Sequence, residues 1–191
     1  MNRTMKAART LIVLAAVGGL ATLGAFSAFT SQANNPNNQV SSGTVTLADN
    51  DGGTALYDFT GAKPGDSETS CIRVNYTGSL DANVKLYTPD TIGPLGPQVN
   101  LKIEPGTQAS PSFPSCTGFS ADGAAIFDAA LSTFPTTYAG GVSDFPGAGS
   151  SWTNGDAVVY RVTATLSASA PDSAQGATTG LHTIRWEAQN Q

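Results

Sequence analysis

The sequence predicts an all-β protein, an antiparallel β-sandwich of the jelly-roll type with at most one or two short helices in its loops. About seven short segments alternate apolar and polar residues, and no run of helices separates them. The 191 residues include 21 Gly and 11 Pro but only 12% charged residues, a composition typical of a turn-rich β-domain. With 40% hydrophobic residues, the chain can bury one core of its own.

The alternating segments predict the strands in order, because side chains two apart share one face of a strand. The expected core-facing residues are Val45 and Leu47; Ala55, Tyr57 and Phe59; Ile72, Val74 and Tyr76; Val84 and Leu86; Val99, Leu101 and Ile103; Val158, Tyr160, Val162, Ala164 and Leu166; and Ile184, Trp186 and Ala188. Pro105-Gly106 is expected to end the fifth of these strands. The apolar spacing in residues 124–134 predicts the one helix, with a strand at 125–128 as the alternative.

Two turns have specific sequence patterns. Lys63-Pro64-Gly65-Asp66 places Pro and then Gly at the centre of a tight turn, where Pro fixes φ and Gly accepts a positive φ. Residues 49–53, Asp-Asn-Asp-Gly-Gly, also predict a turn. Their oxygen-bearing side chains suggest calcium, but the twelfth position of an EF-hand loop requires Glu and here is Thr60. We therefore predict no metal site.

Residues 1–28 predict a secretory signal peptide, with a basic start and an apolar stretch from Leu11 to Leu23, cleaved between Ala28 and Phe29. An uncleaved membrane anchor is the alternative. Residues 29–42 then form a polar N-terminal arm, and residues 43–191 a single domain. The arm is either a flexible chain end or a strand donated to a neighbour's sheet edge, with Phe29 and Val40 as its anchors.

The charge of the mature chain argues against one class of partner, and its two cysteines predict a covalent bridge. After residue 28 there are six Lys and Arg against 14 Asp and Glu, a formal charge of −8, which disfavours nucleic-acid binding. Cys71 and Cys116 are the only cysteines, and in a secreted chain they predict one disulfide. Cys71 has the parity of Arg73, so the bridge is expected on the outer face. A metal pair or a redox thiol is the alternative.

No catalytic residues and no cofactor are predicted. His182 is the single histidine, so neither HExxH nor a multi-histidine metal site can form, and no G-x-S-x-G occurs. The long loop from Pro135 to Gly155 carries Tyr138 and Trp152, the expected contact residues if the chain is a monomeric binding module.

Four segments resemble the TasA/camelysin family of secreted bacterial proteins. They are KPGDS with the later TGSLDANVKL, the end of the leader GAFSAFTSQ, the first mature segment NNPNNQVSSGTVTLAD and the last strand HTIRWEAQNQ. The resemblance covers both ends of the chain and hardly includes residues 88–150. It implies cleavage by a signal peptidase of the SipW type and secretion to the cell surface or the biofilm matrix.

The resemblance further implies a structural protein that assembles into fibres with itself or with other matrix components, without a membrane span after cleavage. The alternative from the same resemblance is a camelysin-like cell-surface metallopeptidase. The missing zinc motif favours the structural role.

Overall fold

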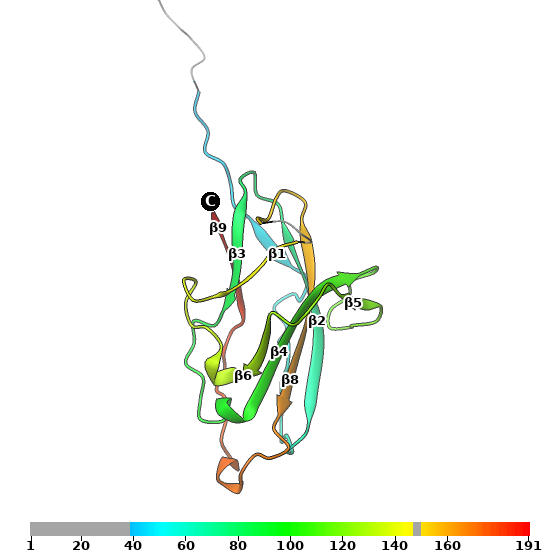
Figure 1. Ribbon diagram of the computed structural model, residues 1–191, viewed down its shortest axis with the longest axis vertical. Coiled ribbons are helices and arrows are strands. Elements are labelled where there is room, and N and C mark those ends of the chain that lie inside the picture. The colour runs from blue at the N-terminus through cyan, green and yellow to red at the C-terminus, as the bar shows by residue number, and fades with distance from the viewer. Residues whose placement is uncertain (1–38, 147–149) are drawn as a thin grey trace, which may run out of the picture. The chain divides into compact units, whose positions relative to one another are not determined.

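A computed structural model describes residues 39–146 and 150–191 and has two antiparallel sheets packed face to face (Figure 1). The large sheet has the order β1-β2-β8-β4-β5, with β6 also paired to β4, and the small sheet has the order β7-β3-β9. All of these strands lie in the unit Ser42–Gln191. Helical structure in the described residues is confined to three short 3-10 turns, and no helix there is long and apolar enough to cross a membrane.

The elements follow one another in this order. They are β1 (Leu47–Asp49), β2 (Ser67–Tyr76), β3 (Ala82–Tyr87), the 3-10 turn Gly96–Gln98, β4 (Val99–Gln108), β5 (Phe119–Ala121), β6 (Phe127–Ala130), the 3-10 turn Leu131–Thr133, β7 (Val142–Asp144), β8 (Ala157–Leu166), the 3-10 turn Asp172–Ala174 and β9 (Arg185–Asn190). The predicted antiparallel sandwich is confirmed. The chain crosses between the sheets at β2–β3, β3–β4 and every connection after β6, as a jelly-roll chain does.

The strand β8 organises the large sheet, because β2 pairs along one of its edges and β4 along the other. Its predicted inner face, from Val158 through Tyr160 and Val162 to Leu166, is at most 6% exposed at each of these residues. Ile72 of β2 lies opposite Tyr160, and Ile103 of β4 lies opposite Val162, so three strands present one continuous apolar surface. The small sheet covers this surface with Val84 and Leu86 of β3, both fully buried.

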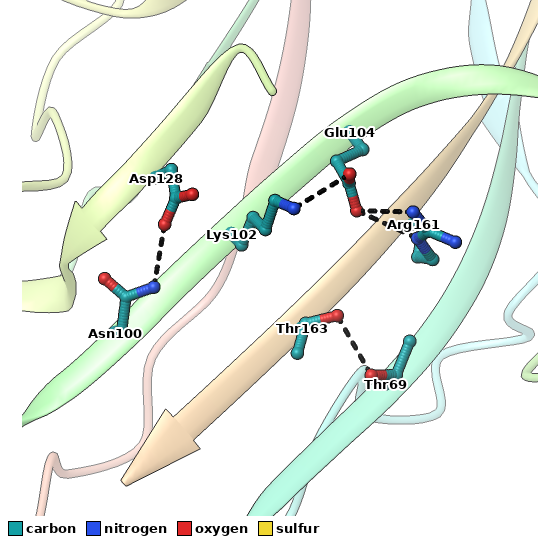
Figure 2. A network of polar contacts seen from close by, with 7 residues as sticks. All are labelled: Thr69, Asn100, Lys102, Glu104, Asp128, Arg161 and Thr163. Carbon is teal, nitrogen blue, oxygen red and sulfur yellow. Dashed lines mark hydrogen bonds and ion pairs between the residues drawn. The ribbon is translucent and has the colours of Figure 1, made fainter. Parts of the chain in front are cut away.

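The outer face of the large sheet is polar (Figure 2). Glu104 of β4 accepts hydrogen bonds from Arg161 of β8, with Nε at 2.9 Å and Nη2 at 2.8 Å, and Lys102 Nζ lies 3.0 Å from its other oxygen. The hydrogen bond from Arg161 holds the pKa of the Glu104 carboxyl below its usual value. The Arg161 guanidinium also lies 4.7 Å from the centre of the Phe119 ring, so it links β8 to both β4 and β5.

Two predicted elements are wrong. Residues 55–59 are not a strand: they form an irregular segment between β1 and β2, although Tyr57 and Phe59 still pack on the core. The alternation of apolar residues in this segment reflects packing on the core, and the segment does not pair with a neighbouring strand. Residues 124–134 are not a helix: β6 and a 3-10 turn occupy them, and Leu131 and Phe134 are buried against the end of the core. The strand alternative for 125–128 was nearer, because β6 begins at Phe127.

Pro105-Gly106 does not end its strand, because β4 continues to Gln108. Pro105 lies between the stretch of β4 that pairs with β6 and the stretch that pairs with β5. Its missing N–H therefore interrupts neither ladder, and its carbonyl accepts a hydrogen bond from Asp122 N at 3.0 Å.

The predicted Lys63–Asp66 turn is present. Asp66 N donates to Lys63 O at 2.9 Å, Lys63 N donates to the Asp66 carboxylate at 2.7 Å, and Gly65 has φ 94°. The second of these bonds closes the turn from the side chain, as short Asp side chains commonly do. β2 begins directly after the turn, at Ser67. Gly65 N donates a hydrogen bond to Leu166 O at the end of β8, so the turn also contacts the neighbouring strand.

The Cys71–Cys116 disulfide is present, with Cα atoms 5.1 Å apart. Cys71 lies on the outer face of β2, opposite Ile72 as its parity predicts, yet it is only 2% exposed. The bridged loop covers it, because Cys71 N donates to Pro114 O at 2.9 Å.

The structure assigns the main aromatic core position to Trp152 and not to Trp186. Trp152 is fully buried and donates Nε1 to Asp144 O at 2.8 Å, whereas Trp186 is half-buried. We expect Trp152→Ala to lower the free energy of unfolding by about 3–5 kcal/mol. Trp186→Ala should cost distinctly less in the same chemical denaturation series. Equal costs for the two substitutions would contradict this assignment.

We expect peptide mapping of the purified protein under non-reducing conditions to find the Cys71 and Cys116 peptides linked. Because the bridge closes a loop of 45 residues, the Cys71→Ser, Cys116→Ser double variant should lose on the order of 4 kcal/mol of stability. Two thiols that react with an alkylating reagent in the native protein would show that the bridge does not form.

Candidate functional site

A cleft of about 860 Å³ opens on the side of the sandwich where both sheets end. β1 is the last strand of the large sheet, β9 is the last strand of the small sheet, and residues of both line the cleft. The apolar lining residues come from the segment 54–62, from the loop before β4, from the approach to β9 and from strands of both sheets, β9 included; among them are Leu47, Leu56, Tyr57, Phe59, Leu95 and Trp186. Leu181, on the rim, is fully exposed.

A tyrosine–histidine pair spans the cleft. The Tyr57 hydroxyl lies 2.6 Å from His182 Nε2, and His182 Nδ1 lies 2.9 Å from Gly180 O. A carbonyl oxygen can only accept, so Nδ1 carries the proton and Nε2 accepts from the Tyr57 hydroxyl. Burial raises the pKa of Tyr57 well above its usual value, which keeps this hydroxyl a donor. The pair therefore ties the 54–62 segment to the chain that enters β9.

Acidic side chains lie at the mouth of the cleft. Burial, and next the charge of Asp51, raise the pKa of Asp49. Asp51 closes the predicted 49–53 turn by accepting a hydrogen bond from Gly53 N at 2.6 Å. Across residues 39–146 and 150–191, no group of three or more His, Cys, Asp or Glu side chains is arranged to hold a metal.

A buried polar cluster lies behind the cleft wall. The Asp144 Oδ2, Tyr160 hydroxyl and Trp186 Nε1 atoms are inaccessible to solvent, and none has a hydrogen-bond partner of good geometry within the described chain. The Tyr160 and Trp186 rings are 5.5 Å apart. Burial raises the pKa of Asp144, and the nearby Tyr160 hydroxyl opposes that rise. Burial and the charge of Asp144 in turn raise the pKa of Tyr160.

The residues predicted for function are not gathered at one place. The Lys63–Asp66 turn and the disulfide lie in the framework of β2, and Trp152 belongs to the core, so it cannot be the contact residue of a binding module. Tyr138 is half-buried and donates to Asn83 O at 2.9 Å. Val40 is fully exposed, whereas the predicted cleavage position and arm anchor, Ala28 and Phe29, lie outside the described residues.

The sequence predicts neither the cleft, nor the Tyr57–His182 pair, nor the burial of Asp144. Residues 57 and 182 are 125 positions apart, so their contact depends on the sandwich bringing two loops together. The one available signal was Tyr57 itself, an aromatic residue in a segment that was wrongly assigned as a strand. Asp144 carries no local sign of burial, because its strand has only three residues.

No family model matches the chain, and no curated protein matches it either. The class of protein that the fold defines is a small antiparallel β-sandwich with a cleft along its open side.

The buried Asp144 carboxyl predicts a pH-dependent stability. A carboxyl whose pKa is raised on folding contributes stability at low pH, and this contribution is lost as the pH rises through the folded-state pKa. Relative to Asp144→Asn, the wild-type protein should therefore lose stability between acidic and neutral pH, measured by urea denaturation at each pH. The control is Asp172→Asn at an exposed position, which should follow the wild type. Parallel profiles for wild type and Asp144→Asn would contradict the prediction.

Proposed function

We propose that this chain is a secreted structural protein of the cell surface or extracellular matrix, which assembles head to tail into fibres. The observation that carries the proposal is the cleft beside an open strand edge. β9 pairs with β3 along one side, and among the described strands none pairs along its other side. The open edge of the six-residue strand β9 offers the backbone donors and acceptors of its alternate residues, and the adjoining cleft offers apolar pockets. Strand addition uses these two features together.

The donor in this proposal is the N-terminal arm of a second copy, residues 29–42. Its sequence is uncharged, so it can enter a site with an acidic mouth on an acidic protein without repulsion. Phe29 and Val40 are its apolar anchors, and Pro36 must sit at a bulge or face away from the ladder because it has no N–H. Such a contact joins two different surfaces, so it continues into a filament unless its rotation closes a ring.

Secretion is supported by the disulfide, since such bonds persist in oxidising compartments, and by the composition of residues 1–28. The second candidate, a monomeric binding module, is favoured by the cleft itself: its size, and a lining that combines apolar with polar and charged side chains, suit a small ligand. The camelysin-like metallopeptidase rests on the family resemblance alone, and a zinc-dependent protease assay on the same preparation tests it.

We expect the mature chain, starting at Phe29, to form filaments visible by electron microscopy, and the chain without residues 29–38 to stay unassembled in sedimentation. A second variant blocks the acceptor: Ala177→Arg places a long cation in the cleft lining, and Ala168→Arg, at an exposed position outside the lining, is its matched control.

Mixing the two defective chains tests the head-to-tail contact directly. The arm-deleted chain retains the cleft and the Ala177→Arg chain retains the arm, so together they should form pairs but no filaments. Filaments from the arm-deleted chain alone would refute the strand-addition mechanism. A monomeric mature chain at all concentrations tested would favour the binding module.

A further inference from the structure

The 54–62 segment covers part of the core beside β1 and forms one wall of the cleft, but it is weakly joined to both sheets. Leu56, Tyr57, Phe59 and Ala62 pack on the core while the intervening residues are exposed. Residues 55–62 make no backbone-to-backbone hydrogen bond with any described residue. Segments with few such bonds open at a much lower free energy than paired strands do.

Besides this packing, two hydrogen bonds that involve side chains hold the segment in place. Asp58 N donates to the Glu68 carboxylate at 2.8 Å, an exposed contact at the side of the segment. The Tyr57–His182 hydrogen bond is the contact that crosses the cleft, and it joins the segment to the residues leading into β9. Gly53 directly precedes the segment and Gly61 lies near its end; both have positive φ, and glycine is the residue that changes its backbone conformation at least steric cost.

From this arrangement we infer that the 54–62 segment is a displaceable cover of the core at the wall of the cleft, and that the Tyr57–His182 hydrogen bond is the latch that holds this cover in place. The inference rests on the proposed function, in which an arm from a second copy enters this cleft. Tyr57 and Phe59 pack on the core at the cleft wall, in the position that the side chains of an added strand would take in this proposal. Assembly therefore requires the latch to break and the cover to move, so the cover sets the rate at which a neighbour can bind.

The test compares Tyr57→Phe with the wild-type mature chain. This substitution keeps the ring in its packing and removes only the hydroxyl that donates to His182. Tyr138→Phe is the matched control, since it also removes one half-buried hydroxyl hydrogen bond, to Asn83 O, away from the cleft. Amide hydrogen exchange over residues 54–62 reports opening of the cover, and the lag before filament formation in light scattering reports assembly.

Loss of one such bond should speed exchange of residues 54–62 in Tyr57→Phe by roughly five- to tenfold. The assembly lag should shorten by a similar factor, while Tyr138→Phe matches the wild type in both measurements. Exchange no faster than in Tyr138→Phe would overturn the latch. Faster exchange with an unchanged lag would overturn the cover, because its opening would then not limit entry.

A different result separates this inference from the proposed function. If no variant forms filaments but exchange of residues 54–62 rises only in Tyr57→Phe, the fibre role fails. The latch then stands as the contact that fixes the wall of a cleft that takes another occupant.

Discussion

The register of β8 between β2 and β4 is the constraint on which the rest of the structure depends. Because side chains alternate across a sheet, a slip of one residue would expose Val158 to Leu166 and bury the polar face. The observed register instead turns Tyr160 inward, toward Trp186 and Asp144, and turns Arg161 outward, onto Glu104. The register of β8 therefore positions both Tyr160 in the buried polar cluster and Arg161 in the ion pair on the outer face.

The two sheets differ in width, and this difference creates the cleft. Six strands face three, so the small sheet cannot cover the whole inner surface of the large one. At one end of the core, Leu131 and Phe134 fill the uncovered space from a 3-10 turn and the residue after it. Beside β1, the irregular 54–62 segment covers it only in part. The candidate site is therefore a consequence of incomplete coverage, and it needs no dedicated domain.

Strict alternation in long segments made most of the sandwich predictable, as in β2, β4 and β8, and the lone pair of cysteines made the disulfide predictable. The prediction failed where short apolar periods are ambiguous: Tyr57 and Phe59 alternate without a ladder, and residues 124–134 match a helix yet pack as a short strand and a turn. The candidate site could not be predicted, because Tyr57 meets His182 only after distant loops converge. Trp152 was expected to be a contact residue for a related reason: it lies in the irregular loop before β8, outside the alternating segments, and yet it fills the core.

If the chain forms the proposed fibres, the disulfide has a mechanical consequence. The bridge joins β2 to the loop after β4, and 45 positions separate its two ends along the chain. When tension pulls on the two ends of the chain, the residues between Cys71 and Cys116 stay outside the path of force. At about 3.5 Å for each extended residue, the bridge withholds on the order of 150 Å of extension from every unfolded copy. Each copy that unfolds would then lengthen the fibre by a shorter step, and the fibre would recover its length more readily after the load is removed.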